Sequence, residues 1–342
     1  MKSTWDPPCD WIRIDVIDGH AAGEPLRVVL DGFPDLPGET IMAKRRYLKE
    51  RHDDLRKAIM WEPRGHADMY GAILTPPVTP DGDFGVLFTH NEGMSTMCGH
   101  GTIALTTVLF DTGLIAREGD DPVVRLDTPA GRVTATAHRR GPRTEQVSFL
   151  NVPSFVYARD EVVEVPGLGR IRYDIAFGGA FYAFVRAEDL EVGLAGDSFN
   201  ELVDKGMKVK RAVMAQREIR HPLEPDLGFL YGTIIVGAPH DPRHHSRNVC
   251  VFANGEVDRS PTGTGVSARA ALHYGAGEIV KGQPFVVESI LGTCFTGRVI
   301  EETSVGPFPA VIPEVGGSAS ITGRGQLLLD PADPLKHGFI FR

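Results

Sequence analysis

The sequence has few cysteines, no long apolar run and no cluster of basic residues. Four cysteines in 342 residues are too few for a disulfide scaffold, and they lack the close spacing of metal-binding pairs. No stretch approaches about eighteen consecutive apolar residues, so no membrane-spanning helix is expected. The first residues, MKSTWDPP, contain no apolar core of a signal peptide, which favours a cytoplasmic protein.

The charge balance argues against one class of partner. The 36 Lys and Arg residues are outnumbered by 45 Asp and Glu residues, which gives a formal charge of −9. Because no basic face or run stands out, a nucleic-acid partner is not expected. A small anionic substrate can still be held by local helix dipoles. The length exceeds the usual size of one hydrophobic core, so two domains are expected.

The most informative stretch runs from Met97 through the sequence CGHGT to an apolar segment, residues 103–110. This segment has helical length and stops before Gly113, a typical C-terminal cap. Cys98 is therefore expected at a helix N-terminus, where free N–H groups and the helix dipole favour a thiolate. From this stretch alone, a buried cysteine packed as a small hydrophobe is an equally good interpretation.

A second copy of this stretch changes that balance. Shifting the sequence by 164 residues (262 − 98) places CGHGT on TGTGV, so that Cys98 falls on Thr262. In the same register Phe88 falls on Phe252 and Gly113 falls on Gly277. The chain is therefore interpreted as two related halves. Two glycine-rich helix N-termini facing each other would form a small anion-binding pocket.

Two alternative interpretations of these motifs are weaker. The sequence TGTG at Thr262 lacks the Lys of a phosphate-binding loop and the glycine spacing of a dinucleotide fold. His240, His244, His245 and Asp241 invite a metal site, but the turn-like sequence DPR between them matches no helical ligand pair. A structural loop near the pocket is the simpler interpretation.

The remaining pattern is that of an α+β protein. Residues 11–18 and 26–30 predict a hairpin, and residues 40–62 predict one or two amphipathic surface helices. Many short strands and few helices follow, including a helix near residues 199–218. Such separate runs favour α+β halves over a doubly wound parallel sheet.

At this point the sequence resembles the proline racemase family over most of its length. The likeness rests on the motif MCGHGT at Cys98, DRSPTGTG from Asp258, DGHAAGEPLRVV from Asp18, GGAFYA from Gly178 and SRNVCVF from Ser246. One departure is Thr262, where racemases and epimerases of this family carry a second cysteine. The Cys–Thr pair resembles the trans-3-hydroxy-L-proline dehydratase branch. Ala21 also departs from the Thr that is common there.

The resemblance implies a fold of the diaminopimelate epimerase type. Two pseudo-symmetric, barrel-like halves would each wrap round a central helix, with the active site at their interface. Residues 1–152 would form the first half and residues 153–325 the second, and a C-terminal strand near residues 326–342 would return to the first. No metal or cofactor is implied, and a homodimer is one option for assembly.

The implied reaction is dehydration of trans-3-hydroxy-L-proline to Δ1-pyrroline-2-carboxylate and water. Cys98 would abstract the Cα proton, and Thr262 would face it in the catalytic pair. Substrate-binding roles are implied for Gly99, His100, Asp258, Gly263 and Thr264, with Asp258 and His100 at the ring nitrogen. Asp258 alone, before Ser-Pro, would otherwise be a turn residue.

Three alternatives stay open from the sequence. Within the family they are a 4-hydroxyproline 2-epimerase and a proline racemase, in which Thr262 or a water would act as the second acid. Outside the family, a cysteine hydrolase could use His100 as the base for Cys98. Two opposed helix termini have no evident use in acyl transfer, which favours the dehydratase.

Overall fold

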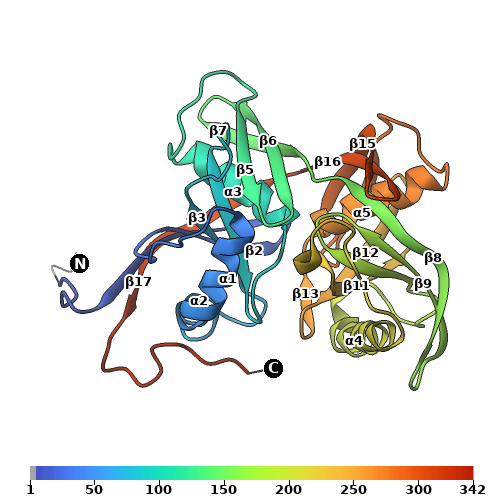
Figure 1. Cartoon of the computed structure of the whole chain (residues 1–342), viewed down its shortest axis with the longest axis horizontal. Coiled ribbons are helices and arrows are strands. Elements are labelled where there is room, and N and C mark those ends of the chain that lie inside the picture. The colour runs from blue at the N-terminus through green and yellow to red at the C-terminus, as the bar shows by residue number, and fades with distance from the viewer. Residues whose placement is uncertain (1–4, 342) are drawn as a thin grey trace.

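The computed structural model describes residues 5–341, which form two lobes placed side by side (Figure 1). The first lobe contains β1 (Ile12–Ala21), β2 (Glu24–Asp31), α1 (Ile41–Arg51), α2 (Asp53–Met60), β3 (Tyr70–Thr75), β4 (Phe84–His90), α3 (Gly99–Asp111), β5 (Val123–Thr128), β6 (Gly131–Arg140), β7 (Arg143–Leu150) and β17 (Ala319–Leu329). The second contains β8 (Ser154–Val165), β9 (Gly169–Phe177), β10 (Phe181–Arg186), η1 (Gly196–Ser198), α4 (Phe199–Gln216), η2 (Pro225–Leu227), β11 (Leu230–Gly237), β12 (Ser246–Phe252), β13 (Glu256–Asp258), α5 (Gly263–Gly275), β14 (Phe285–Glu288), β15 (Cys294–Val305) and β16 (Phe308–Gly317).

The two lobes repeat one strand plan, as the sequence comparison predicted. In the first lobe β2 runs parallel to β3, β3 antiparallel to β4, and β4 parallel to β5. In the second lobe β10, β11, β12 and β14 repeat these three relationships in the same order. The hairpin β5–β6–β7 corresponds to β14–β15–β16. The predicted fold of two α+β barrel-like halves is therefore confirmed.

Each half surrounds a central helix. Helices α3 and α5 have 13 residues each and start at Gly99 and Gly263, so the repeat of 164 residues (263 − 99) holds at their first residues. Every α3 residue from Gly99 to Phe110 is buried, because strands of the barrel cover the helix on all sides. A helix that is apolar all round needs such complete burial.

The C-terminal strands join the halves. Strand β17 pairs antiparallel with β1 from Ala319 onward, ahead of the start near residue 326 that the sequence suggested. The preceding strand β16 pairs with β7 of the first lobe and with β8 and β15 of the second. Figure 1 shows β16 crossing between the lobes. This return fixes the first half against the second.

One element was not predicted. The sequence suggested a crossover after residue 153, but β8, a strand of 12 residues, begins at Ser154. Its pairing with β9 shifts register twice, and Asp160 within it has a φ of 51°. Such bulges break the two-residue alternation by which a strand is recognised in sequence.

Candidate functional site

The active-site cysteine lies where the sequence predicted, at the N-terminus of α3. Cys98 has an extended backbone and is the N-cap residue, and its sulfur accepts a hydrogen bond from Gly101 N at 3.2 Å. His100 Nδ1 lies 3.3 Å from the same sulfur. The N–H groups of a first helical turn have no intrahelical acceptor. Those of Gly99 and His100 can therefore bind an anion beside the thiol.

The second helix begins differently. Thr262 precedes α5 with a φ of 65° and its side chain does not cap the helix. Positive φ is unusual for a β-branched residue, and strain of this kind costs about 1–3 kcal/mol. Its Oγ1 is buried and has no well-formed hydrogen bond to the residues that the structure describes. Thr262 is thus held toward the site and is not a helix cap.

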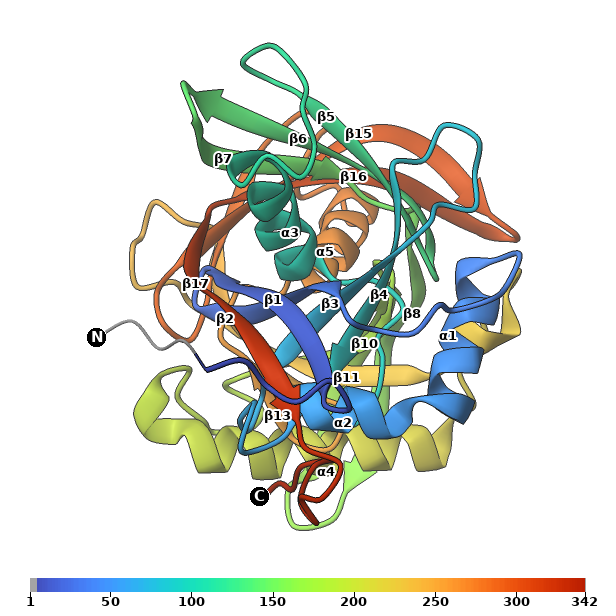
Figure 2. The ribbon, with the colours of Figure 1, turned by 90° about the vertical axis from the view of Figure 1, so that its left-hand side faces the viewer.

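The two helix N-termini meet at a pair of glycines. A Cβ atom placed on Gly99 would lie 2.5 Å from Gly263 Cα, and one on Gly263 would lie 2.6 Å from Gly99 Cα. Figure 2 shows α3 and α5 side by side at the centre of the molecule. This contact brings the free N–H groups of both helices to one place. The facing helix termini predicted from the repeat are present in the structure.

A small cavity lies at this junction. It is lined by Tyr70, Met97, Cys98, Gly99, His100, Tyr182, Tyr231, Cys250, Phe252, Asp258, Thr262, Gly263 and Thr264. All seven site residues that the sequence suggested are among them. The free space is about 20 Å³, which suits a water molecule rather than a ring. The halves must therefore move apart, or side chains must shift, before a larger ligand can enter.

The protonation states of Cys98 and His100 follow from burial. Burial raises the pKa of the Cys98 thiol well above its ordinary value, and the Gly101 N–H opposes this effect while the Asp258 carboxylate adds to it. The expectation that the helix N-terminus makes Cys98 a thiolate is therefore wrong for the empty site. Burial lowers the pKa of His100 to about 3, so its imidazole is neutral. A neutral, weakly basic imidazole is a poor general base for a hydrolase.

Asp258 lies on the second wall. Its side chain is 5% exposed, and Oδ1 accepts a hydrogen bond from Ser260 N at 2.7 Å. Burial raises the pKa of Asp258 to about 6, and hydrogen bonds from Ser260 and the Thr262 hydroxyl partly oppose that rise. The residue is thus both a turn residue and a cavity residue. A buried carboxylate without an ion pair of its own is suited to a cationic ligand.

A second buried carboxylate lies close to Asp258. Glu24 is fully buried; its Oε2 accepts a hydrogen bond from Arg259 N at 2.6 Å and its Oε1 has no printed partner among the described residues. Burial raises the pKa of Glu24 well above its usual range, and the nearby Asp258 carboxylate raises it further. Arg259 also pairs with Asp68 of the first half. These contacts fix the loop before Thr262 against the first half.

The histidine-rich loop does not gather into one metal site. The backbone N–H groups of His240 and Asp241 donate to Glu288, and His244 Nδ1 lies 2.8 Å from Glu288 Oε1.

His245 instead lies near His273 and Glu278, which together could hold a cation. However, the buried Arg269 guanidinium lies 3.4 Å from His245 Nδ1 and 3.2 Å from His273 Nε2. Its positive charge opposes a cation there.

Sequence reasoning missed the aromatic lining of the cavity. Tyr70 and Tyr231 are the residues before Gly71 and Gly232, which occupy corresponding positions in β3 and β11. The repeat, extended to these strands, would have pointed to this pair. Cys250 was expected to be a core residue; it is buried and also lines the cavity.

Comparison with known proteins assigns the chain to a family. A family model described as proline racemase matches residues 16–340. The trans-3-hydroxy-L-proline dehydratase of Colwellia psychrerythraea is 48% identical over 341 residues, which cover 99% of this chain and 96% of the relative. The 3-hydroxyproline 2-epimerase of Burkholderia multivorans is 46% identical over 329 residues, which cover 96% of this chain and 98% of the relative.

Solved structures agree with this result. A hydroxyproline epimerase from Agrobacterium vitis with bound trans-4-hydroxy-L-proline superposes with a TM-score of 0.93 at 31% identity. The superposition covers 98% of this chain and 96% of the epimerase. Fold, site geometry and sequence agree over nearly the full length, and the chain belongs to the proline racemase family.

Proposed function

We propose that the protein is a hydro-lyase that dehydrates trans-3-hydroxy-L-proline to Δ1-pyrroline-2-carboxylate and water without a cofactor. The observation that carries this proposal is that Cys98 shares its cavity with Thr262 and not with a second active-site thiol at the other helix N-terminus. Residues 1–152 supply Cys98, and residues 153–325 supply Asp258 and Thr262. Cytoplasmic location and a homodimer are expectations that accompany the proposal.

Substrate binding uses both helix N-termini. The backbone N–H groups of Gly99, His100, Gly263 and Thr264 bind the carboxylate and stabilise the charge that grows on it as Cα loses its proton. Donors placed in this way commonly contribute a few kcal/mol each to the transition state. Asp258 faces the ring ammonium, with His100 beside it.

The bound ammonium also prepares the base. In the empty site the Asp258 charge raises the pKa of the Cys98 thiol. A positively charged ring nitrogen next to Asp258 offsets that charge and thus favours the thiolate. Substrate binding therefore makes Cys98 more basic in function at the moment when the Cα proton is presented to it.

The trans geometry then permits one group to complete the elimination. In trans-3-hydroxy-L-proline the hydroxyl lies opposite the carboxylate and on the same face as the Cα hydrogen. Cys98 removes the Cα proton, the electron pair forms the Cα–C3 double bond, and the C3–O bond breaks. The thiol returns the proton to the departing hydroxide, which leaves as water. The enamine tautomerises to the imine product.

Epimerisation is the second candidate because the Burkholderia multivorans relative is named a 3-hydroxyproline 2-epimerase. Inversion needs an acid on the face opposite Cys98. The Thr262 hydroxyl ionises far above neutral pH and is a weak proton donor, so it favours elimination over inversion.

Incubation with separate isomers of proline, 3-hydroxyproline and 4-hydroxyproline tests both candidates. NMR and chiral chromatography distinguish the imine from an inverted amino acid. We expect imine from trans-3-hydroxy-L-proline and no rapid inversion of L-proline or 4-hydroxyproline. Inversion as the main reaction would replace the dehydratase by an epimerase.

A further inference from the structure

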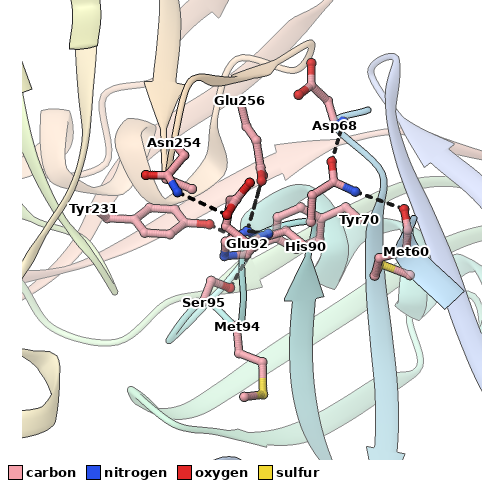
Figure 3. Close-up of polar contacts among 12 residues, drawn as sticks. Met60, Asp68, Tyr70, His90, Glu92, Met94, Ser95, Tyr231, Asn254 and Glu256 are labelled. Atoms are coloured by element: carbon pink, nitrogen blue, oxygen red, sulfur yellow. Dashed lines mark hydrogen bonds and ion pairs between the residues drawn. The ribbon is translucent and has the colours of Figure 1, made fainter. Parts of the chain in front are cut away.

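The hydroxyl of Tyr70 lies at the contact between the halves. Tyr70 is 3% exposed, and its hydroxyl donates to Ser95 Oγ at 2.6 Å. It lies 3.4 Å from the Tyr231 hydroxyl. Figure 3 shows Tyr231 of the second half pointing toward Tyr70 and His90 of the first. Three hydroxyl groups therefore meet in a fully buried region beside the cavity.

The Tyr70 hydroxyl is on the Cys98 side of the cavity. Its ring packs edge-on against the His100 ring, with centroids 4.7 Å apart, and stacks on His90 at 5.8 Å. Its hydroxyl is close enough to the Cys98 sulfur to lower the pKa of that thiol. The cavity's other free-standing tyrosine, Tyr182, instead bonds Thr264 Oγ1 at 2.7 Å. Only the first wall thus offers a phenol next to the thiol.

The proposed reaction creates a need on this wall. The 3-hydroxyl of a trans substrate lies on the face from which Cys98 takes the Cα proton. Hydroxide is a poor leaving group, so negative charge growing on its oxygen must be stabilised while the C3–O bond breaks. Asp258 and the helix N–H groups are already assigned to the ammonium and the carboxylate.

We propose that Tyr70 is a catalytic residue that donates a hydrogen bond to the 3-hydroxyl as it leaves. This inference rests on the proposed function. The bond that breaks is C3–O, its electron pair goes to oxygen, and the proton that completes water is the one that Cys98 removed from Cα. Tyr70 keeps its own proton and stabilises the departing oxygen.

The surroundings of Tyr70 suit a donor. Burial raises the pKa of the Tyr70 phenol well above 10, so it stays protonated and cannot act as the base. Its hydrogen can turn from Ser95 to the substrate, because a hydroxyl rotates freely. Ser95 and Tyr231 can then donate to the Tyr70 oxygen and strengthen the bond that Tyr70 makes.

Tyr70→Phe tests the proposal with two substrates. Trans-3-hydroxy-L-proline must expel hydroxide, whereas trans-3-chloro-L-proline expels chloride, which needs no proton and little stabilisation. Removal of one such donor commonly costs about 10²-fold in kcat. We expect a loss of about that size for dehydration and less than about threefold for chloride release, after subtraction of the uncatalysed rate.

Tyr182→Phe is the matched control, because it removes the same atom from the opposite wall. It should lower both eliminations by the same factor. Ser95→Ala, which leaves the Tyr70 phenol in place, should lower dehydration selectively but less than Tyr70→Phe does. Circular dichroism and thermal unfolding verify that the variants fold.

Equal losses with both substrates in Tyr70→Phe would reduce Tyr70 to a structural residue, and unchanged dehydration would also overturn the proposal. Failure of the proposed function is separate, since it shows in the unmodified protein. If that protein forms no imine from trans-3-hydroxy-L-proline, the dehydratase assignment fails, and with it the role of Tyr70.

Discussion

Gly99 and Gly263 touch backbone to backbone where α3 and α5 begin. Because a Cβ atom on either would lie within 2.6 Å of the other's Cα, no other residue fits this contact without moving a helix. The sequence suggested that these glycines leave room for a ligand. The structure shows that they first leave room for each other, and the ligand-binding N–H groups converge as a result.

Gly99→Ala should therefore separate the two helix N-termini. Overpacking of a tight contact costs about 1–3 kcal/mol of folding stability, and the N–H groups should lose their common focus on the carboxylate. We expect a lower melting temperature and a KM raised at least tenfold for the substrate. Gly196→Ala is the control, because nothing lies within 4 Å of its added methyl group. Wild-type kinetics in Gly99→Ala would contradict the close contact.

Cys98→Ser should remove the base while keeping the shape of the site. General-base catalysis commonly contributes about 10²–10⁴-fold, so kcat should fall by about 10³-fold or more. Binding of the planar analogue pyrrole-2-carboxylate, measured by calorimetry, should persist. Cys294→Ser, which alters a half-buried cysteine outside the cavity, should retain activity. A fully active Cys98→Ser enzyme would rule out the assignment of the base.

Asp258→Asn should weaken both binding and turnover, because it removes the charge that faces the ring ammonium but keeps the side-chain shape. We expect KM to rise and kcat to fall in steady-state assays, with an unchanged circular dichroism spectrum. Unaltered kinetics would leave Asp258 as a turn residue only.

The same variant tests the pKa of Asp258 through folding stability. Its pKa is about 6 in the folded protein and about 3.9 when unfolded. Between these values the folded state binds the extra proton, so the carboxyl group's contribution to stability is present below pH 4 and is lost as pH rises to 6. The wild type should lose about 3 kcal/mol relative to Asp258→Asn over this window. Denaturant titrations at pH 4 and pH 7 measure it, and a constant difference would show that the pKa is not raised.

Thr262→Cys should open a second route for the proton. The unmodified enzyme in D2O should not convert L-proline to deuterated D-proline, because the face opposite Cys98 lacks an effective acid. A thiol at the N-terminus of α5, favoured by the helix dipole, should supply that acid. We expect measurable inversion by chiral chromatography, with deuterium at Cα, and slower dehydration. Racemisation by the unmodified enzyme at a rate rivalling dehydration would show that Thr262 does not set the outcome.

The sequence alone determined the features that depend on local pattern. Glycines, apolar length and end caps located both central helices, and the repeat of 164 residues that relates Cys98 to Thr262 also relates Gly99 to Gly263, the first residues of α3 and α5. These features follow from helix propensity and chain stiffness, which act within a few residues.

Only the tertiary structure decided what surrounds these helices. The contact of Gly99 with Gly263, the nearness of the Tyr70 and Tyr231 hydroxyls and the raised pKa of Cys98 each join segments that are distant in sequence. Burial is a property of the packed halves, and it reverses the protonation state that a helix N-terminus by itself would favour for the thiol. Hydroxyl positions likewise depend on strand register, which is fixed when the two halves close on each other.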